Sequence, residues 1–574
     1  MSIMHKKLVI FYLNYIYKIK QIINIMGIKV LFLYPNTFGM NMIPQAMALF
    51  SSLLKKEGHQ VEIFDSTYYA VDFGLDSDGT QVDKLAVVPF NMEDRGIRIK
   101  DTSWSKDLID QVERFKPDLI GLSTTEDMYE LGLLFLDTIK DYKIKNNIPV
   151  IAGGVFPTFA PEIVIKEKLI DLVCVGEGEN ALIQLCKKIE KKQTYNDITN
   201  CWVKTIGPDY LKDRNVIQKN PISKPVDINS NPVIDISLFE ENRLYRPMGG
   251  KIYKMFPVET IRGCPYTCKF CNSPDQMALY NKETDGGYFR KKKIDLVSKE
   301  LKHFKNDLGV EYNYFWADTF LAMNKKEFEE FCEMYSEIKI PFWFQTRPET
   351  INDYNMKKLA EVGLDRISFG VEHGNEKFRK EVLDRRWSNE QIINKLKIPH
   401  KYGINFSVNN ITGFPKETKK LAFDTIELNR NIDSDNANIH TFVPFHGTPL
   451  RKMCEELGYI KPETITKCIV SDPIMDMPQY PKHEIKGITK CFNLYVKFPK
   501  DRWKEIEKAE KDDDESQKIF KELSAEYLEK YMPAPNSDPH GGLEDFIEAE
   551  KTNQQCIPTP PVKISKNSNE DEMI

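Results

Sequence analysis

Two successive series of short apolar segments, each alternating with helical stretches, most constrain the fold of this chain of 574 residues. The first series spans about residues 28–189 and the second spans residues 258–445. Short buried strands separated by helices are typical of parallel sheets, because parallel neighbours need a long crossover connection. The chain is also longer than one hydrophobic core supports. The sequence therefore predicts an α/β protein of two or three domains.

The first series predicts a doubly wound parallel sheet. Ligands of such sheets bind beyond the carboxyl ends of the strands. The loops expected there are rich in Gly, Ser, Thr and Pro, which lets a ligand approach the backbone closely, although ordinary turns have the same composition. The expected strands are residues 30–35, 61–65, 118–123, 149–154 and 171–179. The candidate ligand-binding residues are Ser123, Thr124, Glu126, Gly153, Gly154, Pro157, Gly176, Glu177 and Glu179.

The second series contains six strand–helix units whose strands end in polar residues. In parallel barrels the active site lies at the carboxyl ends of the strands. Polar groups at these ends must bind something or find a partner, so structural ion pairs are an equal alternative. The expected strands are residues 258–262, 312–320, 342–349, 365–374, 404–415 and 438–445. The polar candidates are Asp318, Arg347, Glu372, His373, Asn409 and Asn410.

Three cysteines in the string RGCPYTCKFCN, at positions 264, 268 and 271, offer three thiolates from one short loop. Cubane iron–sulfur clusters are usually held by four cysteine thiolates, so three leave one iron open to another ligand. A structural zinc site needs four ligands, and the next candidate in sequence, His303, lies more than thirty residues away. The spacing therefore predicts Cys264, Cys268 and Cys271 as ligands of a [4Fe–4S] cluster.

The cysteine loop resembles the signature of the radical S-adenosylmethionine (SAM) enzymes. Three later segments also resemble that family: GVEHGNE at 370–376, NITGFPKET at 410–418 and FVPFHGTPL at 442–450. The resemblance implies an open six-unit β/α barrel. It also implies that the free iron binds SAM, which is cleaved by one-electron reduction to give a 5′-deoxyadenosyl radical.

The same resemblance implies roles for single residues. It makes Glu372 the candidate for binding the SAM amino group or ribose, and it places Phe270 beside the adenine. Asp318 and Asn409 are further cofactor-binding candidates at strand ends. His373 stands where relatives often have serine, so it is expected to face substrate or cobalamin as a catalytic residue.

The first domain resembles the cobalamin-binding domain that precedes many radical SAM domains. The resemblance rests on GGVFPTFAPE at 153–162 and VGEGE at 175–179. A GxGxxG fingerprint is missing after the first strand, which disfavours nicotinamide binding. Residues 65–70 read DSTYYA, without the histidine that ligates cobalt in methionine-synthase-type domains. That segment therefore does not supply a lower cobalt ligand.

Composition and linker signals complete the expected organisation. A net charge of −5 does not favour a nucleic-acid partner. The eight cysteines outside the loop are scattered, which indicates a reduced, cytoplasmic protein, and the N-terminal apolar run is too short for an integral membrane span. The expected parts are an N-terminal extension of uncertain status (1–25), a cobalamin-binding-like domain (26–195), a linker (196–250), a radical SAM domain (251–455), a helical C-terminal region (456–551) and a disordered tail (552–574).

The resemblance implies a cobalamin-dependent, anaerobic radical SAM enzyme, and C-methylation of an unactivated carbon is the favoured reaction. An oxidative cyclase or rearrangement enzyme, as in the anaerobic magnesium-protoporphyrin monomethyl ester cyclase group, is the alternative. A non-catalytic cobalamin or redox sensor is a remote third. The expected partners are a small-molecule, lipid or tetrapyrrole-like substrate and a low-potential electron donor such as flavodoxin or ferredoxin.

Overall fold

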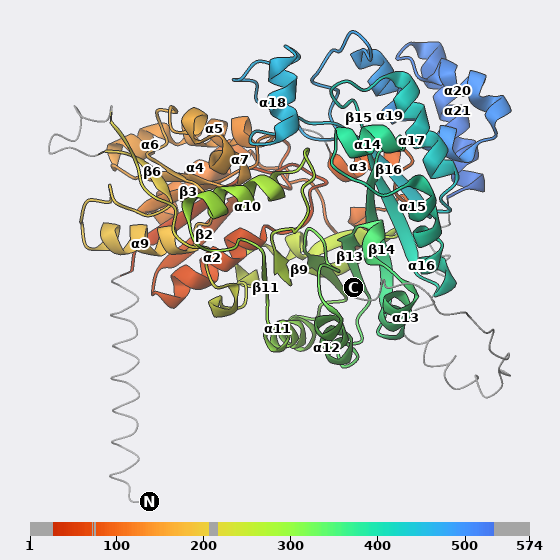
Figure 1. The fold of residues 1–574 in the computed structure, drawn as a ribbon. Coiled ribbons are helices and arrows are strands. Elements are labelled where there is room, and N and C mark those ends of the chain that lie inside the picture. Colours follow the sequence, from red (N-terminus) through yellow and green to blue (C-terminus); the bar gives the residue numbers. More distant parts are fainter. Residues whose placement is uncertain (1–26, 72, 74–75, 206–215, 533–574) are drawn as a thin grey trace, which may run out of the picture.

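The computed structural model describes residues 27–71, 73, 76–205 and 216–532, which include two seven-stranded sheets side by side (Figure 1) and a two-stranded one. The expectations for residues 1–25 and 552–574 lie outside this described part. No helix within it is long and apolar enough to cross a membrane.

The first sheet has seven strands in the order β2-β1-β3-β4-β5-β6-β7. The first five are parallel, whereas β6 and β7 pair antiparallel at one edge. Both of these strands lie within residues 196–250, the range expected to be a linker. The bounds are β1 Lys29–Tyr34, β2 Gln60–Asp65, β3 Leu119–Ser123, β4 Val150–Gly153, β5 Leu172–Cys174, β6 Cys201–Lys204 and β7 Ile217–Lys219.

Both faces of this sheet are covered by helices, which confirms the doubly wound prediction. Alternate residues of a strand point to opposite faces. Val30 and Phe32 of β1 therefore pack with helices α2 (Gln45–Lys56) and α9 (Glu179–Glu190). Their neighbours Leu31 and Leu33 pack in a second core with helices α4 (Trp104–Phe115) and α5 (Tyr129–Thr138). Burial on both sides explains why the strands read as continuous apolar runs.

The second sheet has seven strands in the order β16-β15-β14-β13-β12-β9-β8, and β16 and β8 stand at its two open edges. Six of them are parallel, as the sequence predicts, and β8 adds an antiparallel edge. The bounds are β8 Tyr245–Met248, β9 Lys251–Glu259, β12 Tyr312–Trp316, β13 Phe342–Thr346, β14 Leu364–Glu372, β15 Asn405–Thr412 and β16 Asn436–Thr441. The main helices between them are α11 Ile294–Asn306, α12 Lys325–Tyr335, α13 Asp353–Glu361, α14 Glu376–Glu381, α15 Asn389–Leu396 and α17 Lys419–Arg430.

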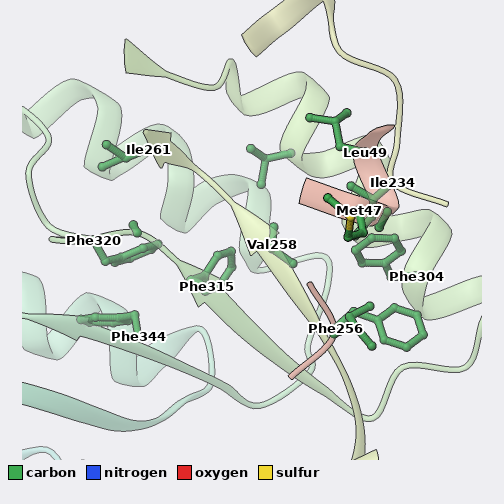
Figure 2. Close-up of a cluster of buried hydrophobic side chains, with 14 of the residues drawn as sticks. Met47, Leu49, Ile234, Phe256, Val258, Ile261, Phe304, Phe315, Phe320 and Phe344 are labelled. Atoms are coloured by element: carbon green, nitrogen blue, oxygen red, sulfur yellow. The ribbon is translucent and has the colours of Figure 1, made fainter. Parts of the chain in front are cut away.

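One hydrophobic core runs from the first sheet into the second. Figure 2 shows Met47 and Leu49 of α2 close to Ile234 and to Val258 of β9. All of these side chains are buried. Removing this shared apolar surface from water holds the two sheets together as a packed unit.

Helix α3 (Ser77–Asp83) leaves the first domain and reaches the second sheet (Figure 1). The Nε2 atom of Gln81 lies 3.4 Å from Nδ1 of His440 on β16. Leu85 and Val88, which follow the helix, belong to the same core as the C-terminal helices. This excursion falls in the segment that the sequence analysis left without an assigned element.

The C-terminal helices are α18 (Pro449–Glu456), α19 (Lys482–Lys497), α20 (Trp503–Ala509) and α21 (Asp514–Lys530). Buried residues of α19 share a core with Ala437 and Ile439 of β16. The described part of this region therefore packs on the outside of the last strand.

Candidate functional site

The cysteine loop lies between the short strand β10 (Ile261–Arg262) and helix α10 (Asn272–Glu283). Each thiol has a hydrogen-bond partner nearby. Cys264 Sγ lies 3.4 Å from the Thr319 hydroxyl, and Cys268 Sγ accepts from Arg347 Nη1 at 3.4 Å. Cys271 is the N-cap of α10, and its Sγ accepts from the backbone N–H of Ser273 at 3.5 Å.

Three thiols on one loop are the donor type that holds an iron–sulfur cluster. Burial, together with the charges of Asp318 and the two other thiols, raises the pKa of Cys271 to about 12. Within the described part of the chain, no three His, Cys, Asp or Glu side chains converge on a single metal position. In a cluster each cysteine binds a separate iron, so its ligands stand further apart than those of one ion. A bound metal would also stabilise the thiolates.

Glu372, at the end of β14, combines a strained backbone with a buried carboxylate, as residues at functional sites often do. Its φ of +72° lies in the left-handed region, at an irregularity of the β14–β15 pairing. Its carboxylate accepts from Arg385 Nη1 at 3.0 Å. Burial raises the pKa of Glu372, and the nearby Arg385 and Arg347 oppose that rise. Sequence reasoning missed Arg385, because one arginine in a polar loop carries no signal of its own.

Asp318, Asn409 and Phe270 occupy different surroundings. Asp318 follows β12, and its carboxylate accepts from the Ser273 hydroxyl at 2.6 Å, beside the cysteine loop. Asn409 bonds to Ser368 Oγ at 2.7 Å, within a polar row on the inner face of the sheet. Phe270 packs against Phe414 with a centroid separation of 6.1 Å, in the core shared with the C-terminal helices.

The face of the second sheet that carries Asn409 is called the lumen below, and β16 continues its polar row. Asn438 Nδ2 donates to Asn409 Oδ1 at 2.9 Å. Burial, with a contribution from the positive charge of Lys84, lowers the pKa of His440 to about 4, so this imidazole is neutral near pH 7. The side-chain oxygens of Gln81 and Asn438 are buried without a partner among the described residues. These polar groups are suited to contact a substrate that enters the lumen.

The structure places His373 away from the lumen, which contradicts its predicted contact with substrate or cobalamin. The side chain is fully buried, and its ring stacks on Phe378 at 4.5 Å. Its Nε2 lies 3.2 Å from Glu417 Oε1, and its Nδ1 accepts from the N–H of Asn375. Neighbours along a strand point to opposite faces, so the inward position of Glu372 sends His373 outward.

Asn410 also points into the helix layer. Its Nδ2 donates to Asn429 Oδ1 on α17 at 3.1 Å, and Asn429 donates back to its Oδ1. This strand-end residue therefore joins a strand to a helix.

A cavity of about 360 Å³ opens between the first sheet and helices α2 and α9. Two glycines in its wall leave no room for a side chain: a Cβ on Gly121 would lie 2.7 Å from the Phe32 ring, and one on Gly154 would lie 2.3 Å from the Thr124 carbonyl oxygen. Six of the predicted ligand residues line it, namely Ser123, Gly153, Gly154, Gly176, Glu177 and Glu179. Its wall also includes five residues of the second domain, namely Glu259, Arg262, Gln276, Tyr288 and Trp316.

Thr124, Glu126 and Pro157 are not among the lining residues of this cavity. Glu126 instead accepts hydrogen bonds from the backbone N–H of His446 at 3.0 Å, from its ring Nδ1 at 2.8 Å and from the N–H of Thr466 at 2.9 Å. The carboxylate therefore ties the first domain to the loop after β16. Burial raises the pKa of Glu126, but the bonds from His446 and Thr466 outweigh burial and hold it below its usual value.

Glu177 and Glu179 join the two domains through ion pairs at the cavity wall. Arg262, which lies two residues before Cys264, contacts Glu177 at 2.8 Å and Glu179 at 2.6 Å. Arg290 contacts Glu177 at 2.5 Å. The network fixes one end of the cysteine loop against the cavity. Sequence reasoning did not find these arginines, because their partners lie some 80 to 110 residues away in the chain.

Comparisons with known proteins agree with this geometry. Residues 258–428 match the family model of the radical SAM superfamily, and residues 75–185 match that of the B12 binding domain. An uncharacterized methyltransferase of Pyrococcus horikoshii is 26% identical over 395 residues, which are 68% of this chain and 81% of that protein. The anaerobic magnesium-protoporphyrin IX monomethyl ester cyclase of Rubrivivax gelatinosus is 23% identical over 61% of this chain and 60% of its own length.

Two solved structures share the fold. The radical SAM methyltransferase TsrM from Kitasatospora setae, with tryptophan and a SAM analogue bound, superposes with a TM-score of 0.54 at 16% identity, over 91% of this chain and 99% of that one. The cobalamin-dependent radical SAM enzyme OxsB, with aqua-cobalamin and SAM bound, gives 0.58 at 16% identity, over 92% and 75%.

The two domain matches confirm the predicted cofactors, which are SAM, a [4Fe–4S] cluster and cobalamin. The cysteine loop lies within residues 258–428, and Gly121, Gly153, Gly154 and Gly176 of the cavity lie within residues 75–185. The chain therefore carries a radical SAM domain at residues 258–428 and a B12 binding domain ahead of it at residues 75–185.

Proposed function

We propose that the protein is a cobalamin-dependent radical SAM methyltransferase that methylates an unactivated carbon. The observation that carries the proposal is the shared wall of the first-domain cavity. Glu259, Arg262 and Trp316 of the second domain line it, and Arg262 leads directly into the cysteine loop. A cofactor seated in the cavity therefore adjoins the strand ends of the second sheet, where the cluster and SAM would be bound.

Three groups would be held by separate sets of residues. Cys264, Cys268 and Cys271 would bind the cluster, which when bound supplies the electron that cleaves SAM, and cobalamin when bound supplies the methyl group. Glu372 and Arg385 are matched to the amino acid end of SAM, because a carboxylate pairs with its ammonium group and a guanidinium with its carboxylate. Without a ligand these two side chains satisfy each other at 3.0 Å.

The cavity would take only part of cobalamin. Its volume of about 360 Å³ is near the lower end of small-molecule sites. The lining is apolar toward α2, where Met47, Leu49 and Phe50 contribute. We therefore propose that the nucleotide tail enters the cavity, while the corrin ring stays at its mouth. The Trp316 side chain is half exposed there and is free to contact the ring.

The protein's own contribution is to hold the reactants together and away from water. Two domains that share one core keep the two sites at a fixed separation. Fixed orientation of reactants replaces a bimolecular encounter and lowers the barrier. The neutral His440 and the amides of Gln81, Asn409 and Asn438 would hold the polar part of the substrate in the lumen.

Oxidative cyclisation is a second candidate, favoured by the match to the magnesium-protoporphyrin ester cyclase. The two reactions differ in their products. Methylation consumes one SAM as methyl donor, which leaves S-adenosylhomocysteine, and cleaves another to 5′-deoxyadenosine. Cyclisation gives 5′-deoxyadenosine without S-adenosylhomocysteine.

The test uses anaerobic, cluster-reconstituted protein with SAM and a low-potential donor such as reduced flavodoxin, with and without cobalamin. Candidate lipids and tetrapyrroles are added as substrates. Cobalamin-dependent formation of both products supports methylation, whereas 5′-deoxyadenosine alone supports cyclisation. Neither product, from protein with a full cluster and every candidate substrate, contradicts both proposals. Cys264→Ala is the control, and it should form neither product.

A further inference from the structure

Arg347 follows β13, and its guanidinium contacts the cysteine loop in addition to its ion-pair partner Glu349. Its Nη1 donates to Cys268 Sγ at 3.4 Å. Its Nε donates to Glu349 at 2.7 Å, and Tyr266 of the cysteine loop lies 3.8 Å from the guanidinium carbon, measured to the ring centroid. The Arg347 side chain is only 10% exposed, so these contacts are shielded from bulk water.

The three cluster thiols have unequal partners. Cys264 meets the hydroxyl of Thr319, and Cys271 meets a backbone N–H. Cys268 alone among them accepts from a charged donor. Because hydrogen bonds to the sulfurs and nearby net charge set the reduction potential of a cluster, Cys268 is the thiolate through which the protein has most influence on it.

We infer that Arg347 raises the reduction potential of the cluster through Cys268, and that Glu349 limits the rise. Reduction adds one electron to the cluster, and no bond forms or breaks in that step. The electron comes from a low-potential donor. A positive charge beside a cluster sulfur stabilises the added electron, and low local dielectric strengthens the effect. The Glu349 carboxylate, bonded to the same guanidinium, offsets part of that charge.

The inference therefore predicts that substitutions of Arg347 and Glu349 shift the reduction potential of the cluster in opposite directions. A pair with only a structural role would not produce opposite shifts. Loss of Arg347 lowers the potential, and loss of the Glu349 charge raises it. The inference rests on the cluster and not on methyl transfer, so it stands or falls independently of the proposed reaction.

The experiment is a redox titration of the reconstituted full-length protein without SAM, followed by the electron paramagnetic resonance signal of the reduced cluster. Arg347→Met keeps the apolar stem and removes the charge and the donor. We expect it to reduce the equilibrium constant for one-electron reduction about tenfold, which corresponds to about 59 mV. Glu349→Gln should shift the potential in the opposite direction. Thr319→Val is the matched control, because it removes a neutral donor from Cys264 and should lower the potential less.

An Arg347→Met potential equal to wild type, at equal iron content, would overturn the inference. So would a shift of the same sign in Arg347→Met and Glu349→Gln. If Arg347→Met does not assemble a cluster, Glu349→Gln decides alone, since it keeps the arginine: a raised potential supports the inference and an unchanged one overturns it.

Discussion

Replacing Glu177 by alanine should loosen the junction between the two domains next to the cysteine loop. Its carboxylate is 5% exposed and receives bonds from Arg262 at 2.8 Å, from Arg290 at 2.5 Å and from the N–H of Val226 at 2.8 Å. Removing one partner of a buried ion pair costs about 3–5 kcal/mol, because the other charge is left without a partner.

The expected loss lies near the lower end of that range. Arg262 keeps Glu179 at 2.6 Å and Glu259 at 2.7 Å, so its charge stays compensated. Among the described residues, Arg290 then keeps the backbone carbonyls of Val226 and Tyr288 as its acceptors. We therefore expect a loss of about 3 kcal/mol, which corresponds to roughly a hundredfold increase in local opening.

Hydrogen–deuterium exchange of the short antiparallel pair formed by β10 and β11 (Arg290–Lys291) measures this opening directly. Glu179→Ala is the matched control, because it leaves Arg290 paired and Arg262 with two carboxylates. Its exchange should rise only several-fold, as for a loss of about 1 kcal/mol. Equal acceleration in Glu177→Ala and Glu179→Ala, or none in Glu177→Ala, would refute the reasoning.

Further outcomes follow from the same geometry. Gly121→Val should abolish cobalamin retention, measured by absorbance after gel filtration, because its side chain would enter the Phe32 ring, 2.7 Å from the Cβ position; retention at the wild-type level would contradict the assigned cavity. Glu126→Gln should lower the thermal midpoint at neutral pH. The folded-state pKa of Glu126 is depressed, so its stabilisation is present above the ordinary carboxyl pKa and is lost as pH falls through the folded value. The gap between wild type and variant should therefore close in acid, and a gap independent of pH would argue against this cause. His373→Asn should lower stability while SAM cleavage per folded, cluster-loaded molecule is retained, and selective loss of cleavage would restore its catalytic role. Cys264→Ala should lose SAM cleavage but still bind cobalamin.

The order of strands and helices and the assignment of the three cysteines as cluster ligands were both predicted from the sequence. Strand and helix periods are local properties, and the six parallel strands of the second sheet match the six predicted segments. The Cys264–Cys271 spacing is equally local, because three ligands from one loop need no tertiary information. The glycines at 121 and 154 are readable as sites of close approach only once the strands around them are known.

What the sequence left open was decided by contacts between distant segments. Glu177 and Glu179 resemble ligand-loop residues, but the fold brings Arg262 and Arg290 to them and gives them a role at the domain junction. Likewise α3 crosses to β16, and Arg347 reaches Cys268 from another strand. Sequence period fixes which residues share a face, whereas the partner that a buried charge meets depends on how segments pack in three dimensions, and only the tertiary structure determines that.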